Sequence, residues 1–482
     1  MTKGAVALVL HAHLPYVRSA QPGSLEEDWF FQALIECYLP LLETLELASA
    51  DPHQQPKLTI GLSPTLLSLL SDQDLKQRFP DWLNERLDLL PKADPSLRAG
   101  AEHLAATIER HRRAWQSCDG DLIQRFAALQ RQGVVDLLTC GATHGYLPLL
   151  RHHPEAVRGQ LRTAVREHQR LVGERPLGIW LPECAYYEGL DRWMRDAGLR
   201  YAVLDGHGLL HGRPRPRYGV YAPICSRNGV AFFGRDSDAT LPVWSAKDGY
   251  PGDPHYREFH RDLGWDLPIE ELKPLGLDQP RPLGLKLHRV TDHSAPLDRK
   301  RPYEPGVAAE RVKEHAADYL QGRRRQLDQL SAAMDVSPLL VAPFDAELFG
   351  HWWFEGPAFL SQLFQQAPQE GVSFTRLRDV LNNVGQLQLC DPCPSSWGQG
   401  GYHDYWLNDS NAWIIPEWEK ASAAMVQRCS RGVGSEQAMQ WLQQAARELL
   451  LAQSSDWSFI LRAGTTTELA KERVQRHLGR FW

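Results

Sequence analysis

Seven short apolar runs, each followed by a residue that can take part in catalysis, constrain the fold of this chain more than any other feature. The runs are four to seven residues long and lie at 6–10, 58–62, 134–140, 178–181, 201–204, 284–287 and 339–344. The stretches between them have a helical period, for example at 156–172 and 188–197. Continuous apolar runs indicate strands that are buried on both faces of a parallel sheet. The alternation predicts an α/β fold, and we favour a distorted (β/α)7 barrel of the TIM type over an open, doubly wound sheet.

Two regions interrupt this alternation. Residues 73–132 are charged, helical in period and free of strand signals, and from residue 394 the chain becomes polar, rich in tryptophan and then helical at 435–453. These changes predict a helical insertion and an all-helical C-terminal domain. The expected division is a catalytic barrel at 1–72 and 133–390, the insertion at 73–132 and the C-terminal domain at 391–482. Turn-forming residues between 235 and 265 predict a long exposed loop there.

Composition and charge exclude several classes of protein. The chain has 482 residues, of which 43% are hydrophobic, so it can bury a substantial core. Its net charge is −6 and it has no long block of Lys or Arg, which argues against a nucleic-acid partner. No segment approaches the roughly 18 apolar residues of a membrane helix. The eight cysteines are scattered, including one isolated pair at Cys390 and Cys393, so we expect reduced thiols and a cytoplasmic location.

Tryptophan is the unusual residue. The chain has 16 Trp against 14 Tyr and 15 Phe, and seven of these Trp lie in the last 86 residues. A surplus of this kind is typical of a large core, of a membrane belt or of a surface that stacks on flat ligands.

Two acidic residues stand directly after apolar runs. Glu183 follows the run at 178–181, and Asp345 follows the run at 339–344 within a segment rich in Phe and Trp. Taken singly, Glu183 is interpreted as a solvated residue at the end of a strand, and Asp345 is interpreted as a helix cap. Taken together on one barrel rim, they supply a carboxylate and a partly desolvated carboxyl that keeps its proton near neutral pH. Cleavage of a glycosidic bond needs this combination.

Histidines follow the first run in the pattern His11-Ala12-His13. In a barrel this spacing directs both imidazoles toward the same opening. A metal site, with further ligands from His144, His207 or His288, is one interpretation of the pattern. Contacts to sugar hydroxyls and a structural role are the others, and the spacing alone does not separate the three.

Five segments, in chain order, resemble the five sequence regions of glycoside hydrolase family 57. They lie at 11–15, 141–148, 180–184, 343–352 and 456–459, and begin with His-Ala-His-Leu-Pro, Gly-Ala-Thr-His-Gly, Trp-Leu-Pro-Glu-Cys, Pro-Phe-Asp-Ala-Glu and Asp-Trp-Ser-Phe. The segments at 249–254, 395–398 and 406–408 resemble its 1,4-α-glucan branching enzymes in particular. The resemblance extends from residue 5 to about residue 460, which is nearly the whole chain.

This resemblance implies a retaining mechanism that uses neither a metal nor a cofactor. Glu183 matches the catalytic nucleophile and Asp345 matches the general acid/base. They would cleave an α-1,4-glucan such as amylose, amylopectin or glycogen and transfer the cut chain to a glucose 6-hydroxyl. Tyr250 would lie on a loop over the active site, and the C-terminal domain would contribute to the active-site groove through Asp456. The residues expected to bind substrate are His11, His13, His144, Tyr250, Trp352, Trp397, Trp406, Asp456 and Trp457.

The tryptophan surplus has a sharper interpretation on this basis. We expect Trp180, Trp193 and Trp441 in the core, and we expect Trp413 to join Trp397, Trp406 and Trp457 as a flat surface for glucose rings. One departure from the family pattern is Leu287-His288, where relatives usually have two aromatic residues, so one stacking contact is expected to be missing.

Other functions remain open at this point. Within the family they are an α-amylase and a 4-α-glucanotransferase. Outside it they are a metal-dependent deacetylase or amidohydrolase built on His11 and His13, and a glucan-binding protein without activity. We expect no membrane partner and favour a monomer.

Overall fold

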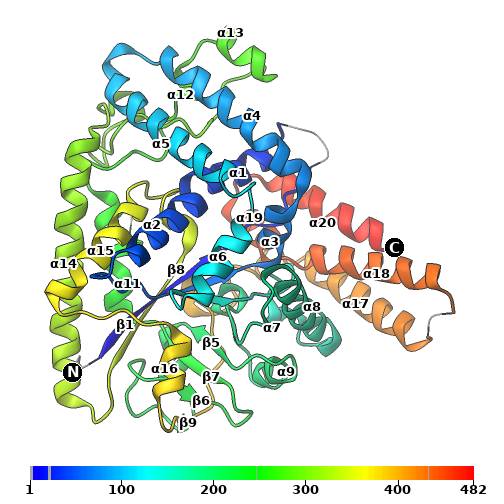
Figure 1. Ribbon diagram of the computed structural model, residues 1–482. Helices are drawn as coiled ribbons and strands as arrows, with labels where there is room; N and C mark the ends of the chain where they lie inside the picture. The colour runs from blue at the N-terminus through cyan, green and yellow to red at the C-terminus, as the bar shows by residue number, and fades with distance from the viewer. Residues whose placement is uncertain (1–3, 20–22, 246, 433) are drawn as a thin grey trace.

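Two β-sheets lie at the centre of the molecule and helices surround them (Figure 1). The computed structural model describes residues 4–19, 23–245, 247–432 and 434–482. The strands are β1 (Ala5–Ala12), β2 (Leu58–Leu62), β3 (Val135–Leu138), β4 (Gly178–Ile179), β5 (Tyr201–Leu204), β6 (Ile224–Cys225), β7 (Ala231–Gly234), β8 (Leu339–Asp345) and β9 (Gln388–Leu389). One sheet has the order β3-β2-β1-β8 and is parallel throughout, and the other has the order β4-β5-β7-β6-β9.

Two sets of contacts join the sheets. Thr139, just after β3, forms an isolated parallel bridge with Ile179 of β4. At the other side the backbone N–H of Asp236, just after β7, donates to the carbonyl oxygen of Val341 in β8 at 2.8 Å. The fold is therefore of the α/β type, with parallel pairing that continues from one sheet toward the other.

The central strand β1 shows why the apolar runs are continuous. Val6, Leu8 and Leu10 pack in one core cluster, whereas Ala7 and Val9 pack in another. Successive side chains of a strand point to opposite faces, so both faces of β1 are buried. This pattern is typical of strands in parallel sheets that are covered on both sides.

Six of the seven predicted runs contain a strand, and the run at 284–287 does not. Leu287 is buried there, 1% exposed, and its carbonyl oxygen accepts from the N–H of Tyr303. The prediction of a strand was wrong because an apolar run reports burial, and this run is buried against helices instead of within a sheet. A strand that was not predicted from the sequence, β7, is present instead.

Helices follow or separate most of the strands. Between β1 and β5 they are α1 (Leu25–Ala33), α2 (Leu39–Ala50), α3 (Pro64–Ser71), α4 (Gln73–Leu89), α5 (Arg98–Gln116), α6 (Leu122–Arg131), α7 (Leu147–Leu150), α8 (Pro154–Val172) and α9 (Leu190–Asp196). Several begin at side-chain caps: the hydroxyl of Ser63 accepts from the N–H of Leu66, and the carboxylate of Asp72 accepts from the N–H of Leu75. The predicted helices at 156–172 and 188–197 correspond to α8 and α9.

Between β5 and the last strand β9 the helices are α10 (Gly206–Leu210), α11 (Ser237–Trp244), α12 (Leu263–Asp266), α13 (Ile269–Leu272), α14 (Pro305–Ala333), α15 (Gly356–Glu370) and α16 (Leu377–Asn383). The region predicted as one long loop at 235–265 thus contains α11 and the start of α12. The turn-forming residues on which the loop prediction rested lie at 244–254, and α11 ends at Trp244.

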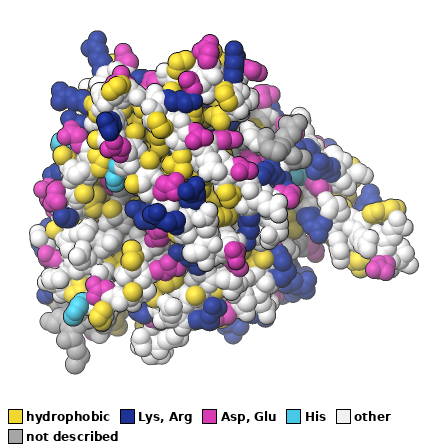
Figure 2. Space-filling view, turned by 45° about the horizontal axis from the view of Figure 1, so that its top comes forward, with side chains coloured by type: hydrophobic (Ala, Val, Ile, Leu, Met, Phe, Trp, Pro, Cys, Tyr) yellow, Lys and Arg dark blue, Asp and Glu magenta, His cyan; other side chains and the backbone are white. Residues whose placement is uncertain are grey.

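Four helices end the chain: α17 (Ile414–Ser430), α18 (Glu436–Ala452), α19 (Ser455–Ala463) and α20 (Thr467–Phe481). The α17–α18 hairpin projects from the body of the molecule (Figures 1 and 2). On the face that Figure 2 shows, basic and acidic side chains are interspersed. Among the described residues, no helix is both long and apolar enough to cross a membrane.

Candidate active site

The carboxyl ends of several strands meet at one cavity. In the β1–β8 pair, His11 lies opposite Asp345, and in the β1–β2 pair it lies opposite Gly61. Glu183 follows β4, and Asp456 reaches the same place from α19. The cavity has a volume of about 750 Å³. The predicted site residues that line it are His11, His13, His144, Glu183, Asp345, Trp352, Trp397, Trp406 and Asp456.

Glu183 is held in a constrained conformation. Its φ of 61° lies in the left-handed region, and the next residue, Cys184, has a φ of 49°. Residues other than glycine adopt this region at a cost, and such residues concentrate at functional sites. Oε2 of Glu183 accepts a hydrogen bond from Nε1 of Trp397, and Oε1 accepts one from the hydroxyl of Ser455, both at 2.9 Å. Burial raises the pKa of Glu183, and these two donors oppose the rise.

Asp345 lies in an environment that favours its protonated form. It is the last residue of β8, and burial raises its pKa well above the usual value, with a further rise from the negative charges of Glu347 and Glu183. A carboxyl in this environment keeps its proton near neutral pH. The cavity therefore contains two carboxyl groups in different environments: two hydrogen-bond donors favour the ionised form of Glu183, and burial favours the protonated form of Asp345.

Glu347 is a site residue that the sequence reading missed. It lines the cavity, and its Oε1 accepts hydrogen bonds from the backbone N–H of His13 at 3.0 Å and from the hydroxyl of Tyr38 at 2.6 Å. Burial raises its pKa to about 7. Its place two residues after Asp345 was the available signal, because both side chains belong to the turn that follows one strand.

A chain of hydrogen bonds connects the histidines to Glu183. Because the carboxylate can only accept, the hydroxyl of Ser455 donates to it and accepts from Nδ1–H of His144 at 2.7 Å. Nε2 of His144 then carries a lone pair and accepts from Nε2–H of His11 at 3.0 Å. Burial lowers the pKa of both imidazoles well below the usual value, and the charge of His13 lowers each further, so both are neutral. Ser455 was not predicted, although it precedes Asp456.

His13 carries the charge in this cluster. Its Nε2 lies 3.1 Å from Oδ1 and 3.2 Å from Oδ2 of Asp456. Burial alone would lower the pKa of His13, but the charge and hydrogen bond of Asp456 raise it overall. Burial alone would raise the pKa of Asp456, but His13 lowers it to about 2. An ion pair thus joins the segment directly after β1 to α19.

Asp456→Asn is expected to lower the free energy of unfolding by about 3 kcal/mol, because it removes one partner of this largely buried pair. The folded pKa of Asp456 is about 2, below its unfolded value of about 3.9, so its contribution is present above that value and is lost as the pH falls through 2. The contribution of His13, whose folded pKa is raised, is lost as the pH rises through that pKa. Urea unfolding at pH 5.5 and pH 3 measures the difference, with the exposed Asp409→Asn as control. An equal loss at both pH values would contradict the ion pair.

Two predicted site residues lie elsewhere. Trp457 is 1% exposed and packs in the core of the C-terminal helices, where its Nε1–H donates to the carbonyl oxygen of Leu451. It points away from the cavity because it follows Asp456 directly on α19. Tyr250 donates its hydroxyl hydrogen to Oδ2 of Asp318 at 2.7 Å and stacks on His315. Both partners belong to α14, and Tyr250 is not among the residues that line the cavity.

The division of the tryptophans between the core and the cavity wall differs from the prediction. Trp180 is fully buried, as expected for a core residue, but Trp441 is 68% exposed, and Trp193 is only partly buried. Trp352 is 45% exposed within the cavity lining, which suits a stacking surface. Trp406 also lines the cavity, but it is 2% exposed and stacks on Tyr146.

The cavity wall includes further residues that the sequence reading did not assign. Trp244, at the end of α11, lies with its ring centroid 5.9 Å from that of Trp397. Arg235 lies within hydrogen-bonding range of Asp205, 3.4 Å. Both residues lie in the segment at 235–265, whose turn-forming residues were the available sign that this region contributes to the site. Other aromatic and imidazole side chains in the wall are Trp29, His351, Tyr405 and Phe459.

Two groups of side chains in the described part of the chain have the spacing of metal ligands. One consists of His11, Cys140 and His144, and the other of His13, His144 and Asp456. The carboxyl pair gives the cavity a second chemical capacity, since a nucleophile and an acid on one aromatic-lined cavity suit glycosidic bond cleavage.

Comparison with known proteins identifies relatives along the whole chain. The model of glycosyl hydrolase family 57 matches residues 7–391, and a model described as the C-terminal part of 1,4-alpha-glucan branching enzymes matches residues 417–482. A 1,4-alpha-glucan branching enzyme of Thermococcus kodakarensis is 32% identical over 98% of this chain and 72% of its own length.

Solved structures of similar proteins superpose closely. An α-amylase of Thermotoga maritima has a TM-score of 0.91 and 35% identity, over 99% of this chain and 92% of its own. A branching enzyme of Pyrococcus horikoshii has a TM-score of 0.89 and 32% identity, over 98% of this chain and 88% of its own.

Proposed function

This chain belongs to glycosyl hydrolase family 57, and from that membership we propose that it is a 1,4-alpha-glucan branching enzyme. The observation that carries the proposal is that Glu183, held by two hydrogen-bond donors, and Asp345, whose pKa burial raises well above its usual value, line one cavity. The match of residues 417–482 to the C-terminal part of branching enzymes supports this activity over others in the family. The substrate is an α-glucan such as amylose, amylopectin or glycogen.

In the first step Glu183 is the nucleophile. Its carboxylate attacks the anomeric carbon of an α-1,4-linked glucose as the glycosidic bond breaks, and Asp345 gives its proton to the departing 4-oxygen. The products are a covalent glycosyl-enzyme and a shortened glucan. The hydrogen bonds from Trp397 and Ser455 hold the Glu183 carboxylate in one orientation for this attack.

In the second step Asp345, now ionised, acts as a base. It takes the proton of a glucose 6-hydroxyl while that oxygen attacks the anomeric carbon, and the bond to Glu183 breaks. The configuration is retained and an α-1,6 branch forms. Water in place of the acceptor gives hydrolysis, so aromatic surfaces that hold an acceptor sugar favour transfer.

The neighbouring side chains have binding roles in this proposal. His11, His13 and His144 contact sugar hydroxyls beside the scissile bond, and Asp456 keeps His13 charged and in place. Trp352 and Trp397 offer faces to glucose rings, and Trp406 supports the wall of the groove.

The proposed architecture is a (β/α)7 barrel formed by β1, β2, β3, β4, β5, β7 and β8. The bridge between Thr139 and Ile179 and the hydrogen bond between Asp236 and Val341 support a closed ring of these strands. We propose a division into a barrel (1–72 and 133–390), a helical insertion (73–132) and a C-terminal helical domain (391–482). The end of the family model at residue 391 supports the boundary before the C-terminal domain.

An α-amylase is the second candidate, because the similar structure from Thermotoga maritima is described as one. Incubation with amylose separates the two activities. We expect new α-1,6 linkages, detected as short chains that a debranching enzyme releases, with little gain in reducing ends. Accumulation of reducing ends without α-1,6 linkages would reject branching in favour of hydrolysis, and longer linear chains would indicate a 4-α-glucanotransferase.

A further inference from the structure

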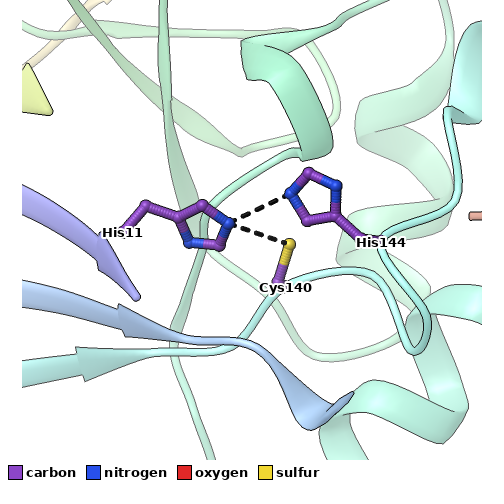
Figure 3. Close-up of side chains that lie close together, drawn as sticks. All are labelled: His11, Cys140 and His144. Atoms are coloured by element: carbon purple, nitrogen blue, oxygen red, sulfur yellow. Dashed lines mark hydrogen bonds between the residues drawn. The ribbon is translucent and has the colours of Figure 1, made fainter. Parts of the chain in front are cut away.

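Three side chains that can ligate a metal converge beside the cavity: the imidazoles of His11 and His144 and the thiol of Cys140 (Figure 3). Nε2 of His11 lies 3.0 Å from Nε2 of His144 and 3.9 Å from Sγ of Cys140. The three atoms lie within 4.8 Å of one another, and all three residues are buried. His11 comes from β1, whereas Cys140 and His144 follow β3.

These separations are close to those within a metal coordination sphere. A tetrahedral Zn²⁺ with Zn–N bonds of about 2.0 Å and Zn–S bonds of about 2.3 Å separates its ligand atoms by about 3.3–3.6 Å. The two measured separations each differ from that range by about 0.3 Å, which small side-chain rotations can supply. Imidazole and thiolate together suit zinc and cobalt better than calcium or magnesium.

The hydrogen-bond network makes the group of His11, Cys140 and His144 a better binding site for a cation than the group of His13, His144 and Asp456. Nδ1–H of His144 is engaged by Ser455, so its Nε2 lone pair points toward His11. His13, in contrast, carries a positive charge and is already paired with Asp456. A cation there must break an ion pair, whereas a cation at the first group replaces the hydrogen bond between the two imidazoles and the long one between His11 and Cys140.

We propose that His11, Cys140 and His144 form a binding site for Zn²⁺ or a similar thiophilic divalent cation, and that the occupied site stops glucan turnover. Binding replaces the proton of the Cys140 thiol with a bond from sulfur to the metal and releases that proton to solvent. The proton on Nε2 of His11 moves to Nδ1, and His144 keeps its proton on Nδ1. Water from the cavity completes the coordination, and no group is oxidised or reduced.

Inhibition follows from the position of the site. The cation binds the imidazoles of His11 and His144, which the proposed function places against sugar hydroxyls, and both residues line the cavity. It also adds positive charge next to His144, whose Nδ1 lies 3.8 Å from Oε1 of Glu183. Positive charge there stabilises the free carboxylate and makes it a weaker nucleophile. The inhibitory half of the inference rests on the proposed function, and the binding half does not.

Cobalt tests the binding half directly. Tag-free protein, freed of metal by a chelator and dialysed, is titrated with Co²⁺ and followed by the thiolate-to-cobalt charge-transfer band in the near ultraviolet. We expect one Co²⁺ per chain and displacement by Zn²⁺. Cys140→Ala and Cys140→Ser should lose the band and bind at least about tenfold more weakly. Cys390→Ala, which removes a buried thiol outside the group, is the matched control and should keep both.

Several results would overturn the proposal. The first is absence of the band in the wild type. The second is persistence of the band in both Cys140 variants while their melting temperatures match that of the wild type. The third is cobalt binding that gives no thiolate band and is abolished by Asp456→Asn. For the inhibitory half, Zn²⁺ should stop amylose turnover, a chelator should restore it, and the Cys140 variants should need at least about tenfold more Zn²⁺. Bound Zn²⁺ with unchanged turnover would refute inhibition. A metal-free enzyme inactive on every glucan would instead count against the proposed function, and the cobalt result would stand.

Discussion

Glu183→Gln is expected to lower amylose turnover by about 10,000-fold or more, because the amide cannot form the glycosyl-enzyme. The substitution keeps the shape of a side chain that is held by Trp397 and Ser455. The fold and the affinity for glucan should therefore change little. Initial rates on amylose and the binding of maltooligosaccharides to the variant measure the two effects separately.

A matched control and a chemical rescue make this test specific. Glu188→Gln introduces the same change five residues later at an exposed position, and it should leave turnover close to that of the wild type. In Glu183→Ala, azide can enter the vacated space and attack the anomeric carbon from the face that Glu183 occupied. The expected product is a β-glycosyl azide. Turnover of Glu183→Gln within tenfold of the wild type would remove Glu183 as the nucleophile.

The sequence was sufficient to locate most of the site, because parallel strands place their carboxyl ends at one edge. His11, Glu183 and Asp345 each follow an apolar run, and a fold that aligns those runs brings the three side chains to one cavity. Helix positions such as α8 were also predictable, since their period is local. The C-terminal residue Asp456 came only from the family resemblance, because its contact with His13 joins residues 443 positions apart.

The errors have physical causes. The run at 284–287 reports burial, and burial alone does not separate a strand from an extended segment under helices. Tyr250 was placed over the active site by resemblance. Its hydroxyl donates to Asp318, and no local sequence pattern predicts that contact. Ser455 was missed for the same reason, since its bond to Glu183 spans 272 residues.

The protonation states of the two carboxyl groups depend on their neighbours more than on residue type. Glu183 has two hydrogen-bond donors, which favour its ionised form. Asp345 has the negative charges of Glu347 and Glu183 nearby, which favour its protonated form together with burial. The ionisation of the nucleophile thus helps keep the proton on the acid, so the two groups enter the reaction in complementary states.

Asp345→Asn is expected to lower amylose turnover by about 100- to 10,000-fold, because the departing sugar oxygen then leaves without a proton. An α-maltosyl fluoride needs no such proton, so the first step with this substrate should be largely preserved in the variant. The second step still lacks its base, and the glycosyl-enzyme should accumulate and be detectable by mass spectrometry. The control Asp335→Asn, at an exposed residue ten positions earlier, should behave as the wild type.

The pH profile of the wild type provides the independent check on Asp345. Turnover requires its protonated form, so activity should decline as the pH rises through its raised pKa, and decline on the acid side as Glu183 becomes protonated. Glu347→Gln removes a negative charge that raises the pKa of Asp345, so the alkaline decline should move to lower pH. With the fluoride substrate, formation of the glycosyl-enzyme by Asp345→Asn should show no alkaline decline from this group. An alkaline decline that is identical in the wild type, Glu347→Gln and Asp345→Asn would assign it to another residue and refute Asp345 as the acid.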